Sequence, residues 1–173
     1  MRKLFDYVGP PDLVARARDG TGGLAVGSAV QLEAALASLE ASILEEHGWL
    51  TYTVSSADVL HLAPRRTEHV ECARGGPVSA AGEIRFAADG RLLEVTNNST
   101  GFCPDAVCWE TVADVLSRLG LEVPERWTFE AIFRLCKQCG QRNLVKDDWF
   151  YCRACDAPLP AEWNFGSAKG GAP

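Results

Sequence analysis

Two pairs of cysteines have the spacing that points most directly to chemistry. Cys136 and Cys139 form one Cys-x2-Cys pair, Cys152 and Cys155 form another, and twelve residues separate the pairs. Each pair can deliver two thiolates from one tight turn, and together they complete the tetrahedral set that zinc prefers. Because all four positions are cysteine, no coordination site is left for a substrate. The spacing predicts one structural Zn²⁺ ion, and a redox-active dithiol is the competing interpretation.

The residues around these pairs predict a zinc ribbon. Gly140, directly after Cys139, allows the left-handed backbone that such a turn often needs. We expect Asp147-Asp148 to turn the chain and Trp149–Tyr151 to supply the return strand of a hairpin. Basic residues are interleaved with these aromatic ones: Arg134, Lys137, Arg142, Lys146 and Arg153.

Basic and aromatic residues together could bind nucleic acid by stacking on bases and contacting phosphates. The interpretation we favour is that the aromatic residues form the core of the ribbon and the basic residues are solvated. Residues 126–173 contain 7 basic and 5 acidic residues. Four thiolates with one zinc ion add two negative charges, so almost no positive charge remains.

A second set of reactive side chains lies in the first part of the chain. A cysteine nucleophile needs a neighbouring base, and the weak catalytic candidates are His69, Cys72 and Glu83. Three more residues could extend them to a catalytic or second metal site: His61, Cys103 and Cys108. We expect a strand here, which would place His69 and Cys72 on opposite faces. Buried, unreactive thiols are the favoured interpretation, and the sequence leans against an enzyme.

A third candidate is a polar strand end that leads into a helix. Asn97, Ser99 and Thr100 precede Pro104, and Arg74 lies in a glycine-rich loop. Small polar residues before a helix can present amide and hydroxyl groups to an anion or a carbonyl. The same residues can simply cap the helix, and this is the interpretation we favour.

The elements that must position these residues predict an α+β fold. Helices are expected over residues 11–18, from Ser28 to about Glu46, and from Pro104 to Leu119; Ser28 and Gln31 have capping-box spacing. Strands are expected at Leu50–Val54, Asp58–Ala63, His69–Ala73, Glu83–Ala87 and Arg91–Thr96, with a hairpin turn at Asp89-Gly90. The result is a small, mostly antiparallel sheet with two main helices, followed by the ribbon.

Charge and composition divide the chain near residue 125. Residues 1–125 carry 10 basic and 18 acidic residues and are expected to form the α+β domain. Residues 126–165 are expected to be the ribbon with an apolar latch at Trp163–Phe165, and residues 166–173 a disordered tail. No apolar run is long enough to cross a membrane and no signal peptide is evident, so the sequence predicts a cytoplasmic protein. The acidic balance argues against non-specific binding of nucleic acid.

The first domain resembles a module found in plant IQM-type calmodulin-binding proteins and in domains of bacterial secreted effectors. The matching residues are His69, Gly75-Gly76, Ala80-Ala81-Gly82-Glu83, Asp89-Gly90, Asn97, Ser99 and Pro104. Val70-Glu71-Cys72 replaces the Ser-Ser-Phe of the pattern, Gly101 replaces its second histidine, and Phe102 stands where the pattern has tyrosine. Chemistry that needs the second histidine is therefore not implied, and without a basic IQ-type helix neither is calmodulin binding.

The whole chain resembles a bacterial family, without an established activity, that joins this module to a C-terminal zinc ribbon. The corresponding segments are Val8–Pro11, Glu68–Val70, Asn97–Pro104 and the ribbon with Trp163-Asn164. This resemblance implies an architecture and no activity.

Three functions remain in order of preference. The first is a zinc-stabilised protein-interaction module, such as an immunity or regulatory protein of a bacterial toxin, effector or defence system, whose acidic surface suits a basic client. The second is an enzyme acting on a small molecule or nucleotide through His69, Glu83 and Asn97–Thr100. The third is binding of nucleic acid through the ribbon.

Overall fold

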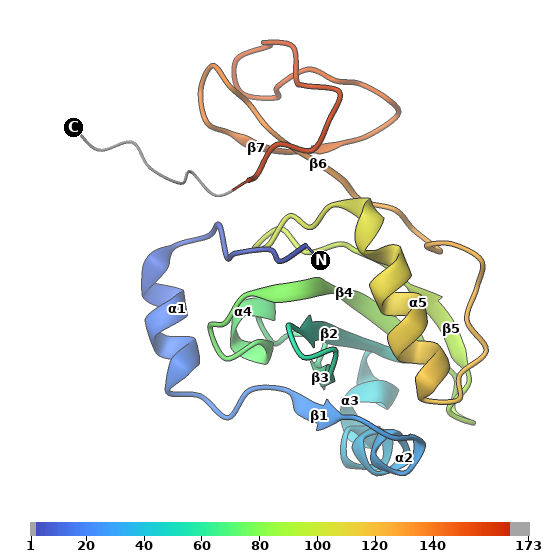
Figure 1. The fold of residues 1–173 in the computed structure, drawn as a ribbon. Coiled ribbons are helices and arrows are strands. Elements are labelled where there is room, and N and C mark those ends of the chain that lie inside the picture. Colours follow the sequence, from blue (N-terminus) through green and yellow to red (C-terminus); the bar gives the residue numbers. More distant parts are fainter. Residues whose placement is uncertain (1–2, 167–173) are drawn as a thin grey trace. The chain divides into compact units, whose positions relative to one another are not determined.

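The structure is a computed structural model of the chain and describes residues 3–166. The chain divides into two compact units, residues 1–130 and residues 131–173. The first unit is an α+β domain, and the second contains the two cysteine pairs. The predicted fold class is confirmed (Figure 1). Most of the predicted tail, residues 167–173, lies outside the described residues.

A five-stranded sheet with the order β1-β3-β2-β4-β5 forms the centre of the first unit, and every neighbouring pair is antiparallel. Its strands are β1 (Leu24–Val26), β2 (Trp49–Ser55), β3 (Leu60–Pro64), β4 (Val78–Phe86) and β5 (Leu92–Val95). Asp89-Gly90 makes the predicted turn between β4 and β5. Gly90 has a φ of 82°, and the Ala87 amide donates to the Arg91 carbonyl across the turn.

The two faces of this sheet have different chemistry. Tyr52 faces one side in register with Leu62 and Gly82, in a buried apolar layer. Helix α5 (Trp109–Arg118), which follows the short helix η1 (Ala106–Cys108), packs on this side. Thr53 and His61 face the other side, where α4 (His69–Cys72) packs, with α1 (Pro11–Arg18) against α4 (Figure 1).

Helix α4 replaces a strand that the sequence predicts at His69–Ala73. The amides of Cys72 and Ala73 donate to the carbonyls of Glu68 and His69, so the segment forms one helical turn. An apolar alternation over five residues fits a strand and a helical turn equally well, since both bury Val70 and Cys72. Strand β1 was missed for a related reason, because three residues are too few to show a period.

The predicted helix of residues 28–46 is two helices. Helix α2 (Ala29–Ser38) ends at Leu39, and α3 (Glu40–Glu45) begins after it. Only the backbone of Leu39 leaves the helical conformation, and its side chain stays buried, so the apolar periodicity runs through the break. The predicted cap is confirmed, because the Ser28 hydroxyl accepts from the Gln31 amide and the Gln31 side chain accepts from the Gly27 amide.

The second unit contains one regular hairpin of β6 (Ile132–Leu135) and β7 (Arg142–Val145). The predicted return strand at Trp149–Tyr151 is wrong, since Tyr151 makes only an isolated bridge to Pro158. Asp147 and Asp148 do turn the chain, each with a positive φ. The core of this unit is small and includes two of the metal-binding candidates: Cys136, Val145, Cys152, Ala157 and Leu159.

Candidate functional site

The structure brings the four predicted metal ligands together. The Sγ atoms of Cys136, Cys139, Cys152 and Cys155 all lie within 4.8 Å of one another. Cys136 and Cys155 are 3.7 Å apart, and Cys139 and Cys152 are 3.6 Å apart. Metal–sulfur bonds of about 2.3 Å in a regular tetrahedron place sulfurs about 3.8 Å apart, whereas a disulfide needs about 2 Å. The four thiols therefore have the geometry to hold a metal ion.

The two Cys-x2-Cys turns repeat the same backbone pattern. The Cys136 amide donates to the Gln141 carbonyl and the Gly140 amide to the Cys136 carbonyl; the Cys152 amide donates to Ala157 and the Asp156 amide to Cys152. The fifth residue of each turn is left-handed, with a φ of 73° at Gly140 and 57° at Asp156. The predicted role of Gly140 is confirmed. An aspartate fills the equivalent position, a residue that tolerates this conformation better than most.

Asn143, which the sequence analysis missed, links the two turns. Its side-chain amide donates to the Gln141 carbonyl and toward the Cys152 sulfur at 3.6 Å, while its oxygen accepts from the Arg153 amide. Burial raises the pKa of the Cys152 thiol, but hydrogen bonds from the amides of Ala154 and Cys155, together with the side chains of Cys139 and Asn143, outweigh this effect and bring the pKa to about 6. These donors prepare the Cys152 sulfur to bind as a thiolate. Asn143 is identified by its burial and by its place within β7, and no spacing in the sequence marks it.

Two polar side chains of the second unit act within its fold. Arg134 donates to the carbonyls of Pro160 and Ala161 and lies 5.6 Å from the centre of the Phe150 ring. Asn164 exchanges two hydrogen bonds with the backbone of Leu135, as a neighbouring strand would. The hydrogen bonds of Arg134 and Asn164 therefore hold residues 160–164 beside β6. At the predicted latch, Trp163–Phe165, these bonds are made by the polar residue Asn164.

The interpretation of the ribbon aromatics as its core is wrong for two of the three. Trp149 is 67% exposed and Tyr151 is 46% exposed, with ring centres 4.9 Å apart, and Phe150 alone packs on the core. The rings of Trp149 and Tyr151 therefore lie on the surface of the second unit. Three of the basic residues named above, Arg142, Lys146 and Arg153, line a separate hollow of about 400 Å³.

The weak catalytic candidates do not form an accessible reactive centre. The ring of His69 makes a 2.9 Å hydrogen bond to the Gly82 carbonyl, and burial lowers its pKa. Cys72 is fully buried beside Thr53, and burial raises its pKa to about 11. Glu83 is paired with Arg65 at 3.0 Å. A protonated thiol that water does not reach is a poor nucleophile.

The candidate ligand-binding residues contact different parts of the fold. Arg74 lies against Gly22, whereas Asn97 and Ser99 are buried in the segment before Pro104. The Asn97 amide donates to the Pro104 carbonyl, and the Ser99 carbonyl accepts from Cys103. Thr100 is exposed, and its carbonyl accepts from the Cys103 thiol. The contacts of Asn97, Ser99 and Thr100 are those expected of a segment that leads into a helix, and Arg74 lies outside this group.

The alanine-alanine-glycine-glutamate motif has a structural explanation of its own. A Cβ atom on Gly82 would overlap the carbonyl oxygen of Thr96, which also accepts a 2.8 Å hydrogen bond from the Tyr52 hydroxyl. The amide of the next residue, Glu83, donates to the Thr96 hydroxyl oxygen. Glycine is required where β4 meets this carbonyl.

The remaining cysteines are structural. Cys103 and Cys108 are both buried, and burial with the Asp105 carboxylate raises the pKa of Cys108 to about 12. No disulfide links any of the seven cysteines.

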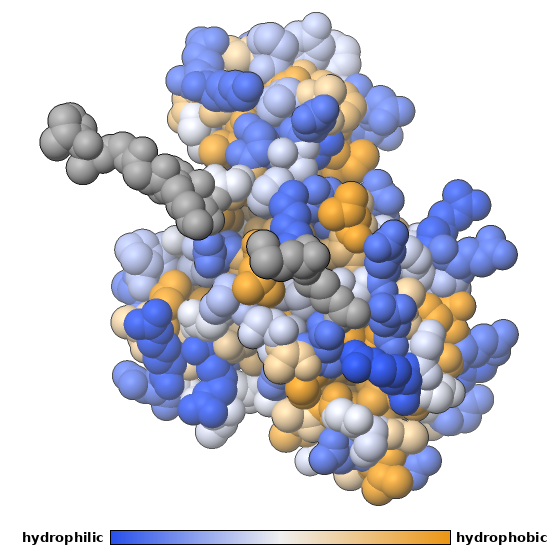
Figure 2. All heavy atoms as spheres, in the orientation of Figure 1, coloured by the Kyte–Doolittle hydropathy of each residue, from blue (hydrophilic) through white to orange (hydrophobic). Residues whose placement is uncertain are grey.

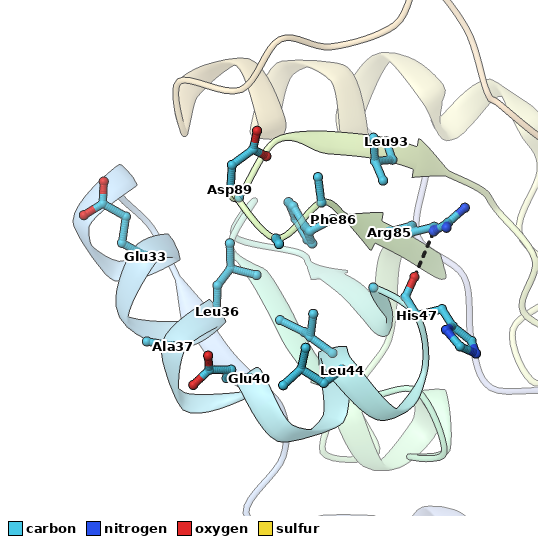
Figure 3. Close-up of a pocket in the computed structure, with 15 residues that line it drawn as sticks. Glu33, Leu36, Ala37, Glu40, Leu44, His47, Arg85, Phe86, Asp89 and Leu93 are labelled. Carbon is cyan, nitrogen blue, oxygen red and sulfur yellow. Dashed lines mark hydrogen bonds between the residues drawn. The ribbon is translucent and has the colours of Figure 1, made fainter.

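A groove that the sequence analysis did not anticipate lies between α2–α3 and the β4–β5 hairpin, with a volume of about 720 Å³. Its floor is apolar and is lined by Leu36, Ile43, Leu44, Phe86 and Leu93. Figure 3 shows Leu36 and Leu44 on the helix side of the groove and Phe86 on the sheet side. Its rim carries Glu33, Glu40 and Asp89. One feature of the sequence could have indicated this groove: no Lys or Arg lies between Arg18 and Arg65.

Comparisons with known proteins leave the function to be argued from this geometry. No protein-family model, no curated protein and no solved structure matches the chain.

The geometry supports two kinds of role. The four-thiol cluster leaves no ligand position for a substrate, so a metal there would stabilise the second unit. The groove offers an apolar surface with acidic edges, which suits binding. Across the described residues, no helix has the length and apolar character needed to span a membrane.

Proposed function

We propose that this protein is a zinc-stabilised protein-interaction module that binds its partner through the groove of the first unit. The observation that supports it best is the pair of helices α2 and α3, whose apolar residues are largely unburied. In α2 the only charged residue is Glu33, yet only Leu32 and Ala35 are buried. No residue of α3 is buried.

Helices of this kind call for a partner surface. Helix α2 has apolar residues around most of its circumference, and such a helix is normally covered by protein, because exposed apolar area costs free energy. Leu44, which lines the groove, is 70% exposed. Figure 2 shows orange, apolar surface among blue residues at the α2 end of the first unit. Contiguous apolar surface rimmed by charge is typical of interaction sites.

Zinc is the proposed metal of the second unit. Four tetrahedral thiolates suit zinc or iron, and a closed set of four cysteines is typical of structural zinc. Metal analysis of the purified chain should give one zinc per molecule. One iron per molecule, with the visible absorption of iron–thiolate bonds, would contradict this assignment.

The partner is proposed to be a protein in the cytoplasm, and the module an immunity or regulatory protein. Buried cysteines that form no disulfide suit a reducing compartment. The acidic surface of residues 1–125, with 18 acidic and 10 basic residues, suits a basic client.

An affinity capture with two matched variants tests the proposal. Leu44→Asp places a charge in the groove, and Val30→Asp places the same charge on an equally exposed apolar residue outside its lining. Tagged, zinc-loaded protein is incubated with nuclease-treated native lysate, and bound proteins are identified by mass spectrometry. A stoichiometric partner that Val30→Asp retains and Leu44→Asp loses supports the proposal. A partner retained by both variants contradicts the groove as its site.

Nucleic-acid binding by the ribbon is a second candidate, favoured by the exposed pair Trp149 and Tyr151. Bases can stack on such rings, and Lys146 and Arg153 could contact phosphates. Fluorescence anisotropy with a single-stranded oligonucleotide tests it. Binding that weakens steeply with salt and is lost in Trp149→Ala would support this candidate. The absence of binding at low salt would exclude it for that oligonucleotide.

A further inference from the structure

We infer that the groove accepts a cationic amphipathic helix of the partner protein. This inference rests on the proposed function and adds to it the class of structure that is bound. Three observations support it: the acidic residues on the rim of the groove, the backbone amides beside the groove that are bonded within the fold, and the apolar floor.

The charges on the groove are acidic and available. Within residues 3–166, the carboxylates of Glu33 and Glu40 form no ion pair or hydrogen bond, and both side chains are exposed. The third acidic residue of the rim, Asp89, accepts from the Arg91 amide and lies near its guanidinium. A partner with lysines or arginines on its polar face therefore complements this rim.

The one arginine of the groove is already neutralised. Arg85 donates to Glu94 at 2.7 Å and to the His47 carbonyl at 2.9 Å, the latter drawn as a dashed line in Figure 3. It also lies over the ring of Trp49 at 5.9 Å. Its charge is therefore compensated within the fold, and the unpaired carboxylates set the sign of the site.

The backbone along the groove has little to offer an added strand. The Phe86 amide donates to the Gly48 carbonyl, and the Ala87 amide donates to Arg91 across the hairpin. These two amides are therefore not free to pair with an added strand, and the side chains that line the groove are left for recognition. A helix satisfies its own backbone and presents apolar residues at helical spacing, which is how helices bind in grooves.

The apolar floor is large enough for several anchoring side chains. Leu36 and Leu44 from the helices face Phe86 from the sheet across the groove (Figure 3). The volume of about 720 Å³ also falls within the range of small-molecule sites. The exposed carboxylates of Glu33 and Glu40 favour the cationic helix over a neutral apolar ligand.

Fluorescence anisotropy with designed peptides tests the inference. The probe is a labelled peptide of about 18 residues, or five helical turns, built from leucine and lysine with the leucines on one face. Its controls are an isomer with scattered leucines and a leucine–glutamate counterpart. We expect the amphipathic cationic probe to bind at least about tenfold more tightly than either control, and more weakly as salt increases.

Matched variants locate the binding. Glu33→Gln with Glu40→Gln should weaken the affinity about fivefold, while Glu122→Gln with Glu125→Gln, outside the groove, should leave it within about twofold. Leu44→Asp should weaken it about tenfold or more, and Val30→Asp should not. Equal binding of the scattered isomer, or binding unaffected by Leu44→Asp, would overturn the inference.

The outcomes separate this inference from the proposed function. If a captured protein partner is lost in Leu44→Asp but is insensitive to Glu33→Gln with Glu40→Gln and to salt, the groove binds protein and the cationic helix is wrong. If sedimentation shows that the wild-type chain dimerises and Leu44→Asp does not, the occupant is a second copy of this chain. That result also overturns the inference.

Discussion

Buried ionisable residues make the stability of the first unit depend on pH. Burial raises the pKa of Cys72 from 9.0 to about 11, so the folded state holds its proton more tightly than the unfolded state. The contribution is complete below about pH 9 and is lost as the pH rises toward about 11. As the pH rises from 8 to 11, we expect the free energy of unfolding of Cys72→Ala to fall by roughly 2 to 3 kcal/mol less than that of the wild type. Urea unfolding of the full chain from pH 8 to pH 11 measures it.

The comparison must be made as a difference between the two chains. Burial also raises the pKa of Tyr52 and, with Asp105, that of Cys108, so the wild-type protein loses stability at high pH for several reasons. Identical pH slopes in the wild type and in Cys72→Ala would show that the Cys72 thiol does not contribute.

The fifth residue of each cysteine turn gives a second prediction. A Cβ atom on Gly140 would meet nothing within 4 Å, so Gly140→Ala tests the cost of the left-handed backbone alone. We expect a loss of about 1 kcal/mol, and a small gain for Asp156→Gly, where φ is 57°. Thermal unfolding of the metal-loaded full chain checks both, and Lys137→Ala is the control. A stabilising Gly140→Ala would contradict the assigned backbone.

Single residues were predictable where the chemistry is local in sequence. Two Cys-x2-Cys turns define the metal ligands because each turn fixes a pair within four residues. Asn143 could not be found in this way, because its role depends on the second turn, ten residues away at Arg153. Trp149 and Tyr151 were misjudged because composition does not say which aromatic ring a small core can accommodate.

At the scale of elements, helices α2 and α3 contribute to a surface more than to the core. We expect Leu44→Asp and Val30→Asp to change the free energy of unfolding by less than about 1 kcal/mol, because both side chains are exposed. Leu32→Ala should cost about 2 to 3 kcal/mol, because Leu32 is buried. Chemical denaturation of the three variants measures this. A large loss in Leu44→Asp would show that Leu44 supports the fold.

Helices and strands were predictable where the apolar periodicity is long enough, or the turn or cap residues characteristic enough, to define them. The β4–β5 hairpin follows from Asp89-Gly90, and the start of α2 follows from Ser28 and Gln31. The break at Leu39 and the helical turn at His69–Cys72 depend on tertiary packing, which overrides short local patterns. The groove depends both on these local patterns and on tertiary packing, because it forms only where α3 ends beside the β4–β5 hairpin.

At the scale of the whole molecule, the two units should respond differently to metal removal. The described core cluster of the second unit has five buried residues, two of them candidate metal ligands, so we expect its folding to depend on a bound metal. The first unit has its own buried sheet and contains none of the four clustered cysteines. We expect a strong chelator to collapse the amide NMR signals of residues 131–166 while those of the first unit persist.

Cys136→Ser with Cys139→Ser should reproduce the effect of the chelator without added chelator. Cys103→Ser is a control, since Cys103 lies outside the metal cluster. A second unit that keeps its dispersed signals after complete loss of metal would show that its core is sufficient alone.

The acidic helix pair also determines which experiments can detect a partner in the groove. With no Lys or Arg from residue 19 to residue 64, trypsin leaves one fragment that ends at Arg65 and contains β1, α2, α3, β2 and the whole of β3. Amine-reactive cross-linkers have no lysine to modify there. Carbodiimide coupling, which joins carboxylates to lysines, should instead link Glu33 or Glu40 to a bound cationic helix, and glutamyl endoproteinase should divide the fragment finely enough to say which.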